Sequence, residues 1–261
     1  MNKVVVTENV RDKRFGPSRV NYTVTPHGEF VNFAESTDSY ERYVKNLNTQ
    51  PLDWYYRDNK VYYNFNSEGF RTKEFKDIDW NNSVVVFGCS NVLGIGLEEK
   101  NTLSSKIEAK IGIPTINMGI GGASILRTFN DSLILAENGF TPKAIVFIWS
   151  DCYRTTLYKK GIVTNIGAWC DGKNDTTEEY WNKWCMDETN PKAHALFNVM
   201  AARRVWQSRT KYFEGTFFLK TGNLLSCPFY EIKDRSRDLS HPGVLTTEMV
   251  SEQIVEGLRK Q

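Results

Sequence analysis

The chain has 261 residues, enough to bury a substantial core in one large domain or in one domain with an accessory segment. Its hydrophobic content of 40%, charged content of 25% and net charge of +2 are ordinary for a globular protein, and they give no reason to expect a nucleic-acid or membrane partner. No apolar run reaches the roughly 18 residues that a transmembrane helix needs, and the N-terminus lacks the pattern of a signal peptide, so we expect a cytoplasmic protein. The five cysteines are an odd number without a CxxC pair, which fits a reducing compartment and argues against a metal cluster or a disulfide framework.

The first part of the chain, residues 1–80, is polar, irregular and rich in tyrosine. Residues 38–47 are predicted to form a short helix. Residues 54–65 are predicted to form a hairpin, with its turn at Asp58 and Asn59 between aromatic residues. Because no independent core is evident, we expect a β-rich arm or cap that packs on the main domain.

From residue 81 to residue 261 the pattern changes to apolar strands that alternate with amphipathic helices. Short connections between such elements predict a mainly parallel sheet covered by helices on both faces, that is, a three-layer α/β/α domain of flavodoxin-like type. Residues 155–190 are polar and bear tryptophans, and they are predicted to be an insertion over one end of the sheet. The predicted strands are 84–87, 115–117, 144–149 and 216–219, and the predicted helices are 102–110, 124–137 (with Ser124 as N-cap), 193–207 and 244–258.

A serine follows the first of these strands on a tight turn, in the sequence Gly88-Cys89-Ser90. Ligands of open α/β sheets bind at the carboxyl ends of the strands, so Ser90 is a candidate nucleophile if a base lies within reach. A turn without chemical function is the alternative. Cys89 is the weaker candidate, because small buried cysteines are usually inert packing residues.

Three further segments follow strands or precede the last helix, and they are expected to meet Ser90 at the same edge of the sheet. Residues 117–124 carry three glycines, which allow the backbone to approach a ligand closely and to present N–H groups, unless they serve only as turn residues. Residues 149–152 follow the third strand. Residues 238–243 contain Asp238 and His241, at a spacing suited to a carboxylate that orients a histidine, although Asp238 as a plain helix cap is the alternative. His194 is expected to be structural, and His27 has no evident partner.

In this order the segments resemble the sequence blocks of the SGNH (GDSL) hydrolase superfamily over roughly residues 83–258. Gly88-Cys89-Ser90 stands in place of the family's Gly-Asp-Ser. Gly122, five residues after Asn117, matches the glycine of the oxyanion hole, and Asp238, His241 and Pro242 match the Asp-x-x-His-Pro block. The runs 66–71 and 87–90 also resemble a phage and environmental-bacterial branch of the family, so a virion location is a second expectation.

The resemblance implies a serine esterase that removes an acyl group, such as acetyl, from a small-molecule or carbohydrate ester without a metal or organic cofactor. Ser90 would be the nucleophile, His241 the base and Asp238 its orienting acid, with the N–H groups of Ser90 and Gly122 in the oxyanion hole. Trp169, Trp181 and Trp184 are candidates for stacking on a sugar, with core packing as the alternative use.

The third block departs from the family pattern Gly-x-Asn-Asp. Trp149 stands at the glycine position and Asp151 at the asparagine position, where an ionised carboxylate would repel a developing oxyanion. Ser150 or a neutral Asp151 is the remaining candidate for the third donor. The alternative reading is a catalytically impaired binding or structural component on this fold, for example of a phage virion. The sequence leaves the oligomeric state open.

Overall fold

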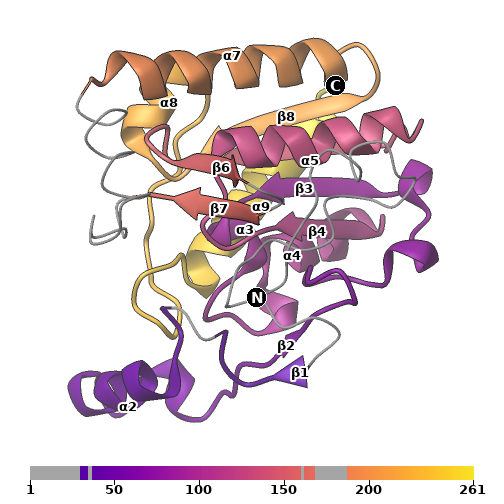
Figure 1. The fold of residues 1–261 in the computed structure, drawn as a ribbon. Coiled ribbons are helices and arrows are strands. Elements are labelled where there is room, and N and C mark those ends of the chain that lie inside the picture. Colours follow the sequence, from indigo (N-terminus) through magenta and orange to yellow (C-terminus); the bar gives the residue numbers. More distant parts are fainter. Residues whose placement is uncertain (1–29, 35–36, 160–161, 168–186) are drawn as a thin grey trace.

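A parallel sheet of four strands forms the centre of the computed structural model, which describes residues 30–34, 37–159, 162–167 and 187–261 (Figure 1). The spatial order of the strands is β4-β3-β5-β8, so the first strand along the chain lies inside the sheet with its two successors on either side. This is the strand order of flavodoxin-like sheets, whose ligands bind where the winding direction reverses. The strands are β3 (Val84–Gly88), β4 (Thr115–Gly119), β5 (Ala144–Trp149) and β8 (Lys211–Thr216).

Both faces of the sheet are covered, which explains why β3 and β5 read as continuous apolar runs. Alternate residues of β3 point to opposite faces: Val85 and Phe87 join one core cluster, and Val84 and Val86 join another. The first cluster includes side chains of α5 (Ile125–Glu137) and α7 (Thr189–Trp206), and the second includes side chains of α4 (Leu103–Ile111) and α9 (Val244–Arg259). The predicted three-layer α/β/α architecture is thereby confirmed (Figure 1).

The four predicted helices of this domain are present, and Ser124 caps α5 by accepting a hydrogen bond from the Arg127 N–H. The predicted strand 216–219 is wrong, because β8 ends at Thr216 and the chain enters α8 (Leu219–Leu225). The Thr216 hydroxyl accepts a hydrogen bond from the Phe218 N–H, and this local turn ends the extended conformation.

The N-terminal segment contains β1 (Phe30–Val31), α2 (Tyr40–Thr49) and β2 (Tyr63–Asn64), and β1 pairs antiparallel with β2. Helix α2 confirms the predicted short helix. The predicted hairpin 54–65 is wrong, because its first half forms a 3-10 helix, Tyr55–Arg57. The Arg57 guanidinium donates to the carbonyl oxygens of Leu47 and Gln50 near the end of α2, and these bonds tie the 3-10 turn to that helix.

This segment packs on the chain that leaves β3. The buried side chains of Ala34, Tyr56, Val61, Tyr63 and Phe65 form one cluster with Leu93, Ile95 and Leu97. Three further 3-10 helices connect the described elements: Phe75–Asp77, Trp80–Asn82 and Glu99–Asn101.

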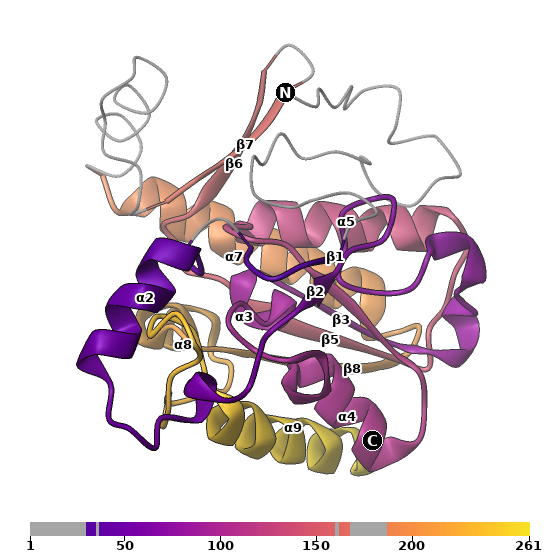
Figure 2. The same ribbon diagram turned by 90° about the horizontal axis from the view of Figure 1, so that it is seen from below.

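Within the predicted insertion, β6 (Thr155–Lys159) and β7 (Ile162–Ile166) form an antiparallel hairpin. Figure 2 shows this hairpin extending away from the layered body of the molecule. Residues 168–186, with the three tryptophans considered as a sugar platform, lie outside the described residues, as does His27.

Candidate active site

Ser90 is the first residue of the short helix α3 (Ser90–Leu93), directly beyond the carboxyl end of β3. Cys89 before it is extended, so the chain turns sharply between strand and helix. Two glycines let α3 lie against the strand ends. A Cβ atom on Gly88 would lie 2.5 Å from Val92 Cγ2, and one on Gly119 of β4 would lie 2.2 Å from the Leu93 nitrogen. The position of Ser90 therefore depends on one glycine in each of two neighbouring strands.

Asp238 and His241 are paired on the loop that precedes α9. His241 Nδ1 lies 2.6 Å from Asp238 Oδ2, and a carboxylate can only accept, so Nδ1 carries the proton. Asp238 Oδ1 also accepts from the backbone N–H groups of Ser240 and His241, at 2.9 and 3.0 Å, and from the Ser236 hydroxyl. These bonds fix the imidazole tautomer and leave Nε2 as the proton acceptor of His241.

The Asp238 carboxyl group is almost wholly buried, and burial by itself would raise its pKa. The hydrogen bond from His241 and its electrostatic attraction to the carboxylate outweigh that effect, together with hydrogen bonds from Thr37 and Ser240, and they hold the pKa of Asp238 well below its ordinary value. Asp238 is therefore a carboxylate at neutral pH, which is the form that can orient the histidine.

Thr37 brings the N-terminal segment into the site. Its hydroxyl donates to Asp238 Oδ2 at 2.6 Å and lies 3.5 Å from His241 Nδ1. Sequence analysis missed Thr37, because 201 positions separate it from Asp238 and no local pattern marks it.

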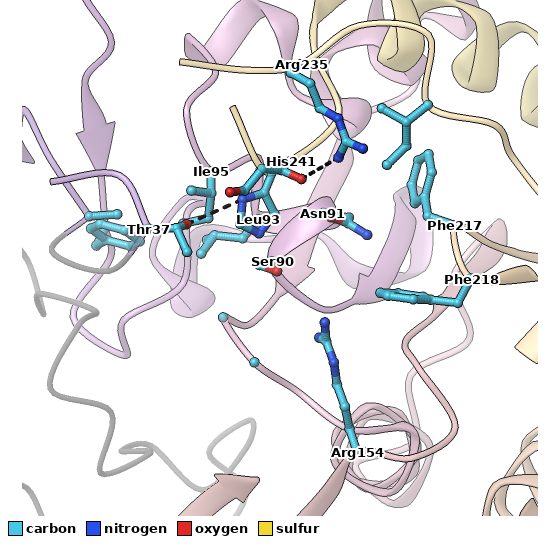
Figure 3. A pocket seen from close by; sticks show the side chains of 16 residues that line it. Thr37, Ser90, Asn91, Leu93, Ile95, Arg154, Phe217, Phe218, Arg235 and His241 are labelled. Atoms are coloured by element: carbon cyan, nitrogen blue, oxygen red, sulfur yellow. Dashed lines mark hydrogen bonds between the residues drawn. The ribbon is translucent and has the colours of Figure 1, made fainter. Parts of the chain in front are cut away.

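Ser90 and His241 line one pocket of about 550 Å³, and Figure 3 shows both side chains on its wall. No hydrogen bond joins the side chains of these two described residues. Catalytic hydrogen bonds often form only once substrate is bound, so the lack of this bond does not exclude His241 as the base for Ser90. Gly122, which has a left-handed backbone with φ of 69°, also lines the pocket and lies beyond the end of β4.

The rest of the pocket combines a mostly apolar wall with two cations. Phe217, Phe218 and Ile232 lie on one side, and Phe65, Leu93 and Ile95 contribute further apolar surface. Arg154 and Arg235 also line the pocket, as does the side chain of Asn91, next to the serine. None of these was predicted as a site residue, although Arg154 and Phe217 follow the ends of β5 and β8, where ligands of such sheets bind.

Ser150 and Asp151 are not among the residues that line this pocket. Ser150 is fully buried, and Asp151 Oδ1 accepts a hydrogen bond from the Tyr153 N–H at 3.1 Å. The segment after β5 reaches the pocket through Arg154 instead. The carboxylate whose charge would oppose an oxyanion is thus engaged with its own loop.

Two further sequence candidates, Cys89 and His194, are not among the residues that line the pocket. Cys89 is fully buried and His194 is an exposed residue of α7. Among the residues that the structure describes, no group of three or more His, Cys, Asp or Glu side chains is arranged to hold a metal ion. In the same part of the chain, no helix is long and apolar enough to cross a membrane.

Comparison with known proteins gives similarity at the level of structure. No protein-family model and no curated protein matches the chain. A solved structure assigned to the lipolytic G-D-S-L family, from Desulfitobacterium hafniense, is 12% identical, with 68% of this chain and 99% of that chain covered and a TM-score of 0.42. The acetyl xylan esterase Est2A from Butyrivibrio proteoclasticus is 10% identical, with 70% and 64% covered and a TM-score of 0.44. AlinE4, an SGNH-hydrolase family esterase, is 12% identical, with 70% and 98% covered and a TM-score of 0.34.

Two of these structures bear the name of the G-D-S-L or SGNH hydrolase family. At such identities and TM-scores, the reaction of this chain has to be inferred from its own residues.

Proposed function

We propose that the protein is a serine esterase of the SGNH type that removes an acyl group, such as acetyl, from a carbohydrate ester. The observation that carries the proposal is His241, oriented by Asp238, on the wall of the pocket that Ser90 also lines. A serine becomes nucleophilic only beside a base, and that base works best when a third group fixes its tautomer. A pocket of about 550 Å³ with a largely apolar lining is of the size that holds a small-molecule ester.

In the proposed reaction, Ser90 Oγ attacks the ester carbonyl carbon while His241 Nε2 takes the hydroxyl proton. The N–H groups of Ser90 and Gly122 donate to the resulting oxyanion. His241 then returns the proton to the departing alcohol as the C–O bond breaks, which leaves an acyl-enzyme. Water, deprotonated by the same histidine, attacks the acyl group and releases the carboxylic acid and free Ser90.

The test is hydrolysis of 4-nitrophenyl acetate by the parent protein and by Ser90→Ala. Loss of the nucleophile should lower kcat at least ~10³-fold, and a fluorophosphonate probe should label the parent at Ser90 only. Ser208→Ala, at an exposed position outside the pocket, is the matched control and should behave as the parent does. Equal rates for the parent and Ser90→Ala would remove the assigned nucleophile. A folded parent that is inert toward aryl acetates and acetylated sugars would instead favour a binding component.

A further inference from the structure

The side chain of Asn91 lies on the wall of the pocket, next to the proposed nucleophile. Asn91 is the second residue of α3 and directly follows Ser90, so the Cα atoms of the two residues are about 3.8 Å apart. Figure 3 shows the Asn91 amide between Ser90 and the rings of Phe217 and Phe218. A polar group at this place lies beside any substrate whose ester carbonyl reaches Ser90.

Asn91 is only 8% exposed, and among the residues that the structure describes none hydrogen-bonds its amide. Buried amides are nearly always hydrogen-bonded in folded proteins, because an unpaired one has lost its bonds to water. The other buried asparagines of the described chain follow this rule, since each side chain makes a hydrogen bond: Asn46, Asn66, Asn101, Asn117 and Asn165. Asn91 departs from the rule, and of these asparagines it alone lines the pocket of Ser90.

The chemistry of this part of the wall indicates the kind of group that the amide binds. A primary amide both donates and accepts hydrogen bonds, which suits a hydroxyl group. Phe217 and Phe218 add apolar surface for C–H groups, and small-molecule pockets combine such surface with a few polar groups that fix orientation. An acetyl group offers only its carbonyl oxygen, which the N–H groups of Ser90 and Gly122 would bind. The hydroxyl group therefore has to belong to the alcohol half of the ester.

We propose that Asn91 determines specificity by hydrogen-bonding a hydroxyl group of the alcohol half, on the carbon next to the esterified one. The short separation of Asn91 from Ser90 places the amide near that position. This inference rests on the proposed esterase function and narrows its substrates to esters of vicinal diols, the class to which acetylated sugars belong. An ester without the hydroxyl group leaves the amide unpaired in the complex, so its transition state is bound less tightly.

The test compares two acetates of the same shape. 2-Hydroxyethyl acetate carries the hydroxyl group, and propyl acetate has a methyl group in its place. Each kcat/KM is divided by the rate constant for hydroxide-catalysed hydrolysis of the same ester, which removes differences in intrinsic reactivity. We expect the parent to prefer 2-hydroxyethyl acetate by about tenfold, the effect of one hydrogen bond. A parent without this preference would overturn the proposal.

Two further esters separate a sugar ring from an open chain as the source of the hydroxyl group. 1-O-acetylglycerol and methyl 3-O-acetyl-β-xylopyranoside both carry a hydroxyl group on the carbon next to the ester. A carbohydrate substrate predicts the larger kcat/KM for the xyloside, because the ring also covers the apolar surface of Phe217 and Phe218. A larger value for the glycerol ester would overturn the sugar as the source and keep the vicinal hydroxyl group.

Asn91→Leu replaces the amide by an apolar side chain of similar shape and should abolish or reverse the preference. Asn91→Ala removes the amide without added bulk and gives the same test if leucine disturbs the fold. Asn48→Leu, at an exposed position of α2, is the matched control and should keep the preference of the parent. Each variant is judged by a ratio of two rates, so a partial loss of folded protein cancels. A preference that survives both Asn91 substitutions would overturn the proposal.

Binding of two amides that are not cleaved separates this inference from the esterase proposal. N-(2-hydroxyethyl)acetamide and N-propylacetamide have the outlines of the two esters. Titration followed by NMR should show tighter binding of the hydroxylated amide to the parent, and Asn91→Leu should abolish the difference. Hydroxyl-selective binding by a parent that hydrolyses no ester would refute the esterase and keep Asn91 as a hydroxyl-binding residue. Hydrolysis and binding that are both indifferent to the hydroxyl group would refute this inference and leave the esterase standing.

Discussion

Asp238 accepts hydrogen bonds from donors on two distant parts of the chain. Four of them come from its own loop: His241 Nδ1, the backbone N–H groups of Ser240 and His241, and the Ser236 hydroxyl. The Thr37 hydroxyl comes from the N-terminal segment. Each of these donors favours the ionised form, so the residue is held as a carboxylate in one orientation although it is buried.

Replacing Asp238 by Asn tests this role at nearly constant volume. The Asn amide would present an N–H group to His241 Nδ1 and so favour the tautomer whose Nε2 cannot accept the serine proton. We expect kcat for 4-nitrophenyl acetate to fall by up to ~10⁴-fold, with His241→Ala at least as damaging. Circular dichroism should show an intact fold in both variants. Parent-like rates in both would mean that the base is misassigned.

The lowered pKa of Asp238 also predicts a dependence of stability on pH. Because the folded-state pKa lies below the unfolded value of about 3.9, ionised Asp238 stabilises the fold above that pH. The contribution disappears as pH falls through the folded-state pKa. The free energy of unfolding of the parent should therefore decrease more steeply below about pH 4 than that of Asp238→Asn.

How far the site could be predicted depended on whether its contacts are local in sequence. The sequence indicates these three residues as candidates for the site: Ser90 follows the end of a predicted strand, and Asp238 and His241 are three positions apart. It does not indicate Thr37 and Arg154, because their place in the site follows from contacts between distant segments. The expectation that Ser150 or Asp151 supplies a third donor to the oxyanion came from a family pattern. Neither residue lines the pocket.

At the scale of elements, the position of α3 depends on how closely it approaches β4. The Asn117 side chain donates to the Val92 carbonyl oxygen at 2.9 Å, and its own oxygen accepts from the Gly119 N–H at 2.9 Å. These bonds fasten α3 above the end of β4, and Gly119 leaves room for the α3 backbone. The position of the helix that begins with Ser90 is thus set by its contacts with a neighbouring strand, and not by the length of the helix.

Gly119→Ala should displace α3. The added Cβ would lie 2.2 Å from the Leu93 nitrogen and 2.7 Å from the Val92 carbonyl carbon, and backbone atoms cannot rotate away as a side chain can. We expect a loss of about 1–3 kcal/mol in the free energy of unfolding and a lower kcat, since Ser90 moves with the helix. Urea denaturation and 4-nitrophenyl acetate hydrolysis measure the two effects.

Gly139→Ala is the control for the backbone alone. Gly139 has φ of 79° with no atom within 4 Å of the added carbon, so alanine there strains the backbone without a clash. It should cost about 1–2 kcal/mol of stability and leave kcat unchanged. If Gly119→Ala kept the parent's kcat, close seating of α3 would not matter for the reaction.

The elements predicted well are those whose pattern reflects burial in the sheet. Strand β5 matches its predicted bounds, 144–149, because every residue in it is buried between two helical layers. The strand 216–219 and the hairpin 54–65 failed for a different reason. In each, bonds to backbone groups, at Thr216 and at Arg57, turned the chain where its residues favour extended structure.

At the scale of the whole molecule, Arg237 joins the N-terminal segment to the loop of the proposed catalytic acid. Its guanidinium donates to both oxygens of Asp38, at 2.9 and 2.7 Å, and to the Asn32 carbonyl oxygen. It also lies over the Phe33 ring, 4.4 Å from the centroid. Both charged side chains are buried, and Arg237 directly precedes Asp238, so this ion pair supports the site as well as the fold.

Asp38→Ala would leave the Arg237 guanidinium buried without its counter-charge. Removing one partner of such a pair costs about 3–5 kcal/mol, because the remaining charge stays desolvated. We expect a loss of that size in the free energy of unfolding, measured by urea denaturation. At urea concentrations well below the unfolding midpoint, the rate of 4-nitrophenyl acetate hydrolysis should also be lower than that of the parent, since the loop around Asp238 loses its ion pair with the N-terminal segment. Glu252→Ala, which breaks only an exposed pair with Lys110, should leave both measurements close to those of the parent. A stability of Asp38→Ala equal to that of the Glu252 control would mean that the N-terminal segment does not support the site through this pair.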